Sequence, residues 1–88
     1  MAVTFSGLAA INTETLGINF EAYRDEDRIV CVVSTGALQD IQPSNASDTA
    51  EEQFLANRFA FQAIAEKLIK AGKDVEGFLY IGSQHVAA

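Results

Sequence analysis

Residues 16–34 read LGINFEAYRDEDRIVCVVS, two strand-like runs on either side of a charged turn. In the first run, residues 16–24, apolar side chains occupy every second position, which is the pattern of a strand with one buried face. Residues 25–27 are all acidic and interrupt this pattern. The second run, residues 28–34, is rich in β-branched side chains, which favour strands. The stretch therefore predicts a β-hairpin.

The side chains of this hairpin also predict its register. With Tyr23 opposite Arg28, the apolar residues of the first strand meet apolar partners on one face. A slip by one residue would set Arg24 opposite Arg28, and like charges directly opposite each other are unfavourable. We therefore expect the first register, which places Cys31 in the core.

The rest of the chain predicts helices and further strands on the same sheet. In chain order we expect a short strand at Val3–Phe5, the hairpin, a short helix, a loop over residues 43–47, a long helix over residues 49–71, a third strand over residues 78–83 and a tail over residues 84–88. The short helix is capped by Ser34 or Thr35, and its apolar edge consists of Ala37, Leu38 and Ile41. The order is β-β-α-α-β with an additional N-terminal edge strand. We predict a single α+β domain over residues 1–88, with an antiparallel sheet of three or four strands and both helices packed on one face.

The long helix carries end signals at both of its termini. Thr49 followed by Glu52, or Asp48 followed by Glu51, matches a capping box, in which the two residues satisfy each other's backbone N–H groups. Gly72 stands where a glycine in the left-handed conformation commonly ends a helix. Both ends of the helix are therefore expected near residues 49 and 71.

The chain is acidic, and its charge excludes several classes of partner. Among its 88 residues, 12 acidic and 6 basic side chains give a formal charge of −6. Such a surface repels phosphate backbones and anionic lipids, so we expect neither nucleic acid nor membrane as a partner. No signal-peptide pattern opens the sequence, and its one cysteine cannot form an internal disulfide. We expect a cytoplasmic protein.

Asn57 and Arg58 are the candidate binding residues on the long helix. They flank its core-facing stripe, which consists of Ala50, Phe54, Phe61, Ile64, Ala65 and Leu68. In one interpretation both are structural, with Arg58 reaching out from the edge of the stripe and Asn57 holding a loop. In the other, they bind a small anion or a partner's carboxylate, with Tyr23 or Tyr80 nearby.

Two pairs of apolar residues point away from the predicted core. Leu55 and Phe59 lie on the outer side of the long helix, where either the short helix covers them or a partner does. Val30 and Val32 lie on the far face of the hairpin, where the N-terminal strand or the tail could cover them instead. If these patches are open, they predict a homodimer or an interface with another protein.

Catalytic and metal chemistry have little support in the sequence. A nucleophilic thiol needs a neighbouring base, and the only pair of this kind is Cys31 with His85. The hairpin register buries Cys31, and His85 lies in the tail. One cysteine and one histidine are too few for a zinc site, and no phosphate-binding or calcium-binding motif is present. We predict no cofactor and no metal, and we rank an enzyme that uses Cys31 and His85 below an interaction module and an anion-binding module, and above a nucleic-acid-binding protein.

Short motifs along most of the chain resemble the domain of unknown function 1488 family of small bacterial proteins. The motifs are Val3-Thr4-Phe5, Ile18-Asn19-Phe20, Ile29-Val30-Cys31-Val32-Val33-Ser34 with Leu38, Phe54-Leu55-Ala56-Asn57-Arg58, and Ile64-Ala65-Glu66-Lys67. The resemblance implies a bacterial cytoplasmic protein with an α+β fold. It implies no activity, ligand or catalytic residue. The sequence thus favours an interaction or regulatory module, with an anion-binding module as the alternative.

Overall fold

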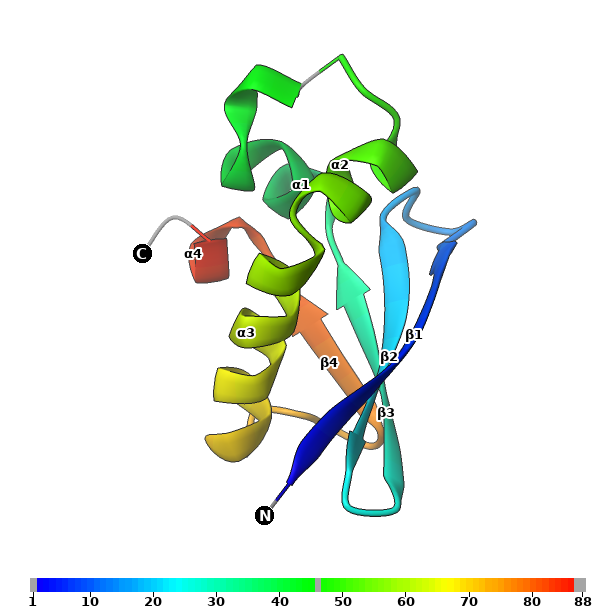
Figure 1. The fold of residues 1–88 in the computed structure, drawn as a ribbon, viewed down its shortest axis with the longest axis vertical. Helices are drawn as coiled ribbons and strands as arrows, with labels where there is room; N and C mark the ends of the chain where they lie inside the picture. Colours follow the sequence, from blue (N-terminus) through cyan, green and yellow to red (C-terminus); the bar gives the residue numbers. More distant parts are fainter. Residues whose placement is uncertain (1, 46, 87–88) are drawn as a thin grey trace.

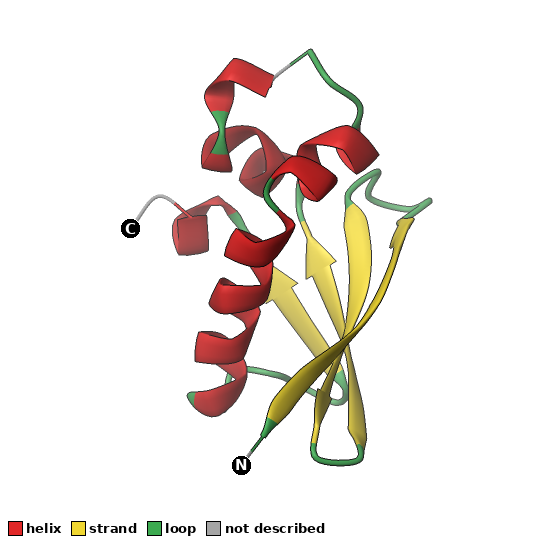
Figure 2. Cartoon of the chain, in the orientation of Figure 1, coloured by secondary structure: helices red, strands yellow, loops and turns green. Residues whose placement is uncertain are grey.

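The computed structural model describes residues 2–45 and 47–86. Within them, four strands form one sheet in the order β1-β2-β3-β4, and the helices gather on one face and at one end of it (Figures 1 and 2). The elements are β1 (Val3–Ile11), β2 (Ile18–Arg24), β3 (Asp27–Val33), α1 (Thr35–Ile41), the 3-10 turn η1 (Pro43–Asn45), α2 (Ala50–Ala56), α3 (Arg58–Lys70), β4 (Phe78–Ile81) and α4 (Ser83–Val86). The α+β class is confirmed.

The β2–β3 hairpin has the register that the sequence predicts. Tyr23 pairs with Arg28, and Phe20 pairs with Cys31, in an antiparallel ladder. Cys31 is fully buried. β2 begins at Ile18 instead of residue 16, because Leu16 has a φ of 64° and belongs to the preceding turn. The strongest local pattern in the sequence therefore specifies the centre of the sheet.

The expectation of a purely antiparallel sheet is wrong, because β4 runs parallel to β3. Val30 pairs with Phe78 and Val33 with Ile81 in the same direction. The chain leaves β3, passes through α1 at one end of the sheet and through α2 and α3 on one face, and returns to the starting end of β3 (Figure 1). A helical crossover of this kind joins parallel strands, whereas a short turn would have joined antiparallel ones. The sheet is therefore mixed.

The N-terminal edge strand is present but longer than the expected Val3–Phe5. β1 has 9 residues and pairs antiparallel with β2, with a bulge between Phe5 and Ala9. Gly7, inside the bulge, has a φ of 84°, which a residue with a side chain rarely adopts. At the other end of the chain, the third strand stops at Ile81, and α4 takes up the start of the expected tail. Residues 87–88, and residue 46 of the expected loop, lie outside the described residues.

The single long helix expected over residues 49–71 is wrong, because the structure divides it at Asn57. The Asn57 N–H donates to Phe54 O at 3.0 Å, a shorter span than in an α-helix. The Gln53 carbonyl instead accepts from the Asn57 side-chain amide at 3.2 Å. An asparagine side chain that competes with its own backbone in this way interrupts a helix. α2 therefore ends at Ala56, and α3 starts at Arg58.

The outer ends of the helical segment agree with the sequence. Thr49 caps α2, and Glu52 completes the capping box; this is the first of the two alternatives. At the end of α3, the N–H of Gly72 donates to Ile69 O at 3.0 Å and that of Lys73 to Leu68 O at 3.0 Å. These two bonds form a Schellman motif, which suits the φ of 74° at Gly72.

The core lies between the sheet and the inner faces of α2 and α3. Phe20, Phe54 and Phe61 form a continuous row of rings, with centroids 5.3 Å and 5.7 Å apart. The helical stripe predicted from the wheel contributes to this core, and Ile69, which the wheel omitted, is also buried. The side of α2 and α3 away from the sheet carries none of the core.

Candidate functional site

Asn57 lies at the junction of α2 and α3 and connects it to the segment after α1. Besides its bond to Gln53, its side-chain amide donates to Gln42 Oε1 at 3.0 Å. The side chain is partly buried, and both bonds are internal. This contact explains how a residue between two helices keeps a fixed conformation, and it accords with the structural interpretation of Asn57.

Arg58 reaches from the start of α3 to the bulge of β1. Its Nη2 donates to the Gly7 carbonyl at 3.1 Å. A Cβ atom at Gly7 would lie 2.8 Å from this nitrogen, so the close approach needs a glycine there. The crevice that Arg58 lines beside Phe54 has no room for a water-sized molecule. Tyr23 and Tyr80, the expected neighbours of an anion site, lie on the opposite face of the sheet.

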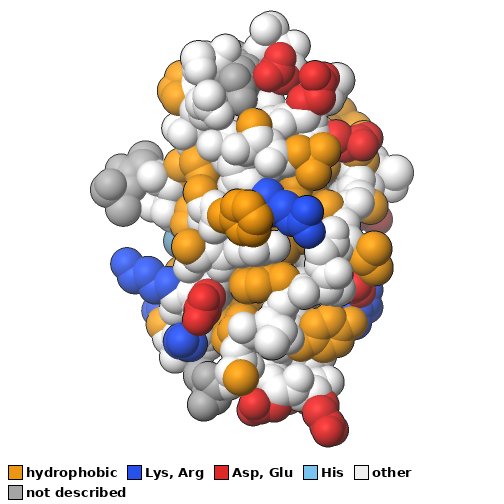
Figure 3. Space-filling view, viewed as in Figure 1, with side chains coloured by type: hydrophobic (Ala, Val, Ile, Leu, Met, Phe, Trp, Pro, Cys, Tyr) orange, Lys and Arg blue, Asp and Glu red, His pale blue; other side chains and the backbone are white. Residues whose placement is uncertain are grey.

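The outer side of α2 and α3 carries a group of exposed apolar residues that we call the helical patch. Phe59 is 79% exposed and Leu55 is 62% exposed, and α1 covers neither of them. The members of the patch are Leu55, Ala56, Phe59, Ala60 and Ala63, all of which are exposed. In Figure 3, hydrophobic side chains surround a basic group at the centre of the face that α2, α3 and β1 present.

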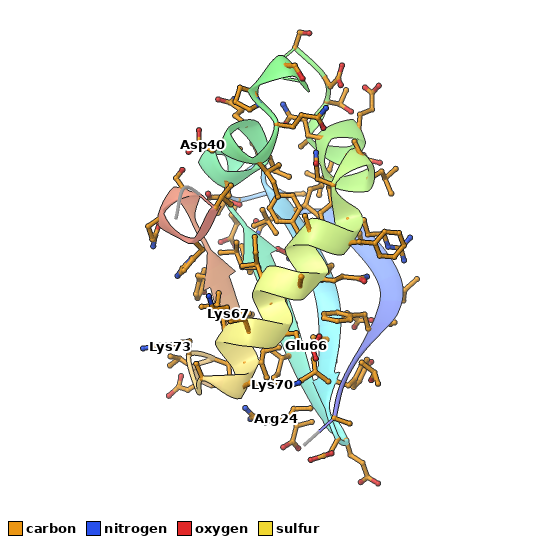
Figure 4. The ribbon with its side chains drawn as sticks, turned by 60° about the vertical axis from the view of Figure 1, so that its left-hand side comes forward. Arg24, Asp40, Glu66, Lys67, Lys70 and Lys73 are labelled. Atoms are coloured by element: carbon orange, nitrogen blue, oxygen red, sulfur yellow. The ribbon has the colours of Figure 1, made fainter. Side chains whose placement is uncertain are left out.

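Charged residues of opposite sign lie at the two ends of the helical patch. Glu51 and Glu52 precede it in the first turn of α2, and both are exposed. Beyond it, Lys67 and Lys70 occupy the last turn of α3. Figure 4 shows these lysines and Glu66 along the C-terminal part of α3, where Lys70 Nζ lies 2.9 Å from Glu66 Oε1. The patch thus has acidic residues at one end and mainly basic residues at the other end, and Arg58 borders its apolar middle.

Val30 and Val32 lie on the face of the sheet that no described helix covers, which we call the open face. Its central residues are Asn19, Glu21, Val30, Val32, Phe78 and Tyr80. Val32 is only 7% exposed, because Asn19 and Tyr80 flank it on the neighbouring strands. Tyr80 itself is 64% exposed, and its ring stacks on Phe78 with centroids 6.4 Å apart.

A shallow groove of about 500 Å³ runs along this aromatic pair, between Tyr80 and the turn after β1. The sequence pattern identifies Val30 and Val32 as the apolar patch of this face, but it does not assign Phe78 and Tyr80 to the same patch. Phe78 and Tyr80 are two residues apart in a strand, so they must share a face. This alternation was the signal that could have identified them.

A polar cluster borders the apolar half of the open face. Arg28 Nε and the Ser6 hydroxyl both donate to the carboxylate of Glu21. The bond from Arg28, supported by the one from Ser6, holds the pKa of Glu21 below its usual range. Nearby, Asn12 Nδ2 donates to Asn19 Oδ1 at 3.1 Å. The polar groups of this face therefore bond to one another.

Cys31 and His85 have separate structural surroundings. Burial raises the pKa of the Cys31 thiol to about 12, and the negative charge of Asp74 adds to the effect, so the thiol is a poor nucleophile at neutral pH. His85 Nδ1 accepts the Gly82 N–H at 3.0 Å, which holds the ring at the start of α4. Across residues 2–45 and 47–86, no group of three or more His, Cys, Asp or Glu side chains is placed to hold a metal ion.

None of the helices in the described part of the chain has the length and hydropathy needed to cross a lipid bilayer.

The DUF1488 family model, described as a protein of unknown function, matches residues 3–80. The chain is also similar to a DUF1488 protein of unknown function from Shewanella loihica PV-4, whose crystal structure was determined at 1.60 Å resolution. The two share 23% identity with a TM-score of 0.72 over 90% of each chain, which shows a common fold. The comparison with curated proteins gives no match. The family match over most of its length shows that the chain belongs to the DUF1488 family.

Proposed function

We propose that this chain is a protein-interaction module and that the helical patch is its binding surface. The observation that carries the proposal is the 79% exposure of Phe59 among the exposed apolar residues of the helical patch. Single exposed apolar residues are common, but a contiguous group built around an aromatic ring is typical of a binding surface.

The energetics favour a covered Phe59. Full burial of a phenylalanine side chain contributes about 1.5–3 kcal/mol. Covering the 79% of Phe59 that is exposed would therefore contribute roughly 1–2.5 kcal/mol before the costs of association. An aromatic residue with this potential is the usual anchor of an interface.

The helical patch is also held rigidly, which lowers the entropic cost of binding. The capping box fixes the start of α2, and the Asn57 side chain fixes the junction. The bond from Arg58 to Gly7 then joins the start of α3 to the edge of the sheet. A partner therefore meets a preformed surface and orders little of it on binding.

The alternative, a small-anion site at Asn57 and Arg58, has weaker support. The side-chain amide of Asn57 donates hydrogen bonds to Gln42 and Gln53, and Arg58 donates to the backbone carbonyl of Gly7. The crevice beside Arg58 is filled by neighbouring side chains. In our proposal Arg58 instead positions the helical patch, and its remaining guanidinium edge borders the patch.

The proposal places the module in the bacterial cytoplasm, with a protein as its partner. A buried, unpaired Cys31 suits a reducing compartment. The charge of −6 disfavours nucleic acid and anionic lipid.

Photo-crosslinking in the bacterium that encodes the chain tests this proposal. A photoreactive phenylalanine analogue replaces Phe59 in the full-length protein, and the matched control carries it at Gln39, an exposed residue of α1. After irradiation, we expect protein adducts from position 59 and far fewer from position 39. Equal yields at both positions, or no adduct at position 59, would contradict the proposal.

A further inference from the structure

We infer that the partner on the helical patch is a second copy of this chain, with the two α3 helices antiparallel across a two-fold axis. The inference rests on the proposed function, because it names the partner of the same surface. It follows from the shape of the patch, its charge pattern and its size.

The shape of the patch is self-complementary. A two-fold interface uses the same surface twice, so that surface must supply both the protruding group and the site that receives it. Phe59 protrudes, and Ala63 is exposed one helical turn further along on the same side. If the axis passes at the level of Phe61, each Phe59 ring lies on Ala63 of the other copy. Because the side chain of Ala63 is small, the helix of the other copy can approach closely, and the Phe59 ring packs on a flat apolar surface.

The charge pattern fits the same arrangement. Glu51 and Glu52 lie at one end of the patch; at the other end, Lys67 and Lys70 outnumber Glu66, which pairs with Lys70. Antiparallel helices bring the acidic end of each copy to the basic end of the other, whereas parallel helices would bring like charges together. Because the break at Asn57 separates α2 from α3, this pairing joins the two ends of the patch, and the position of the axis is set by Phe59 and Ala63 alone. The helix dipoles are also opposed.

The size of the patch predicts a reversible dimer. Two large side chains and three alanines give an interface at the small end of the range, below the roughly 1,200 Å² total of stable complexes. Each copy carries a charge of −6, and the resulting repulsion between copies further limits affinity. The dimer should therefore dissociate on dilution, with a Kd in the micromolar range.

Sedimentation velocity from low micromolar to near-millimolar concentration tests the inference. We expect a shift from monomer to dimer in the unmodified chain. Phe59→Asp should raise the Kd by roughly tenfold or more, since it sets a charge in an apolar contact. Tyr80→Asp, on the open face, is the matched control and should leave the Kd unchanged. Because Phe59 is exposed, its substitution leaves the core intact, and circular dichroism checks the fold of both variants.

A charge-reversal pair tests the antiparallel orientation. One variant carries Lys67→Glu and Lys70→Glu; the other carries Glu51→Lys and Glu52→Gln, in which glutamine keeps the capping role. Each variant alone should associate more weakly than the unmodified chain, and an equimolar mixture should form a heterodimer. A mixture without heterodimer would overturn the antiparallel arrangement.

The outcomes separate this inference from the proposed function. A strict monomer at every concentration, or a dimer that Phe59→Asp leaves intact, overturns the second copy as partner. If the chain is monomeric and position 59 still crosslinks to a protein of different mass, only the present inference fails. If the chain is monomeric and position 59 gives no adduct, both fail.

Discussion

The helical patch and the open face both expose large apolar side chains, but these side chains relate differently to the residues around them. On the open face, Tyr80 is 64% exposed and flanks Val32, which is only 7% exposed. The polar residues beside Tyr80 also bond to one another, as in the hydrogen bond from Asn12 to Asn19. On the helical patch, Phe59 is surrounded by residues that are themselves exposed.

This difference shows that exposure alone does not identify a binding surface. Among the described residues, the helices pack on one face and at one end of the sheet and leave the open face uncovered. Tyr80 therefore serves as an outer layer over an apolar strand residue, and its own exposure follows from that role. Phe59 covers no buried residue of the sheet, so the folded monomer gains little from it. An aromatic residue without a role in the monomer is the better candidate for a partner contact.

The largest expected difference in the free energy of unfolding is between substitutions of two phenylalanines on opposite sides of α3. Phe61 is fully buried and Phe59 is 79% exposed. Phe61→Ala should lower the free energy of unfolding by about 3–5 kcal/mol, because it removes a core ring and leaves a cavity. Phe59→Ala should change it by less than about 0.5 kcal/mol in dilute, monomeric protein. Urea denaturation of both variants measures the difference, and a large loss for Phe59→Ala would mean that the ring packs within the monomer.

A smaller loss of unfolding free energy is expected from substitutions in the contact between Gly7 and Arg58, which joins the helical patch to the sheet. Gly7→Ala forces a side chain onto a φ of 84° and places its Cβ 2.8 Å from Arg58 Nη2. The strain and the displaced arginine should cost about 1–3 kcal/mol of unfolding free energy. Combined with Arg58→Ala, the substitution should cost less than the sum of the two single changes. Additive costs in this double-mutant cycle would show that the Gly7–Arg58 contact does not hold the patch.

Tyr80→Ala tests the structural role of the open face. Removal of the ring exposes Val32, so the free energy of unfolding should fall by about 1 kcal/mol. Dimerisation should be unaffected. If thermal denaturation shows no loss and sedimentation shows weaker association, the roles assigned to the two surfaces would have to be exchanged.

The smallest expected effect is the pH dependence of the stability that the Glu21–Arg28 ion pair contributes. The pKa of Glu21 in the folded chain is lowered from its ordinary value of 4.5, first by Arg28 and then by Ser6. The ion pair therefore contributes stability that is complete above pH 4.5 and is lost as the pH falls through the lowered pKa. The unmodified chain should lose its small advantage over Glu21→Gln as the pH falls through this range. An advantage that persists in strong acid would show that the carboxylate gains nothing from Arg28.

The sequence predicted the local features of the fold well. The hairpin register follows from alternating residues and from the charge of Arg28, and both ends of the helical segment follow from Thr49 and Gly72. All of these depend on residues close together in the chain. The family was also identified from short motifs, and the match over residues 3–80 confirms it.

The features that the sequence did not predict depend on residues far apart in the chain. The helix divides at Asn57 partly because its side chain bonds Gln42, 15 positions earlier. The bulge of β1 meets Arg58, 51 positions later. The parallel direction of β4 depends on the path of the whole crossover. Leu55 and Phe59 could be named from the helical pattern, but whether α1 covered them required the structure.

A dilution series followed by NMR tests the central claim most directly. Amide chemical shifts of the ¹⁵N-labelled chain are compared between dilute and concentrated samples, residue by residue. We predict concentration-dependent shifts at Leu55–Ala63 and in the last turn of α3, with β4 and the rest of the open face unchanged. Shifts centred on Phe78 and Tyr80, or no shift at any concentration, would contradict the assignment of the helical patch as the surface that binds a second copy.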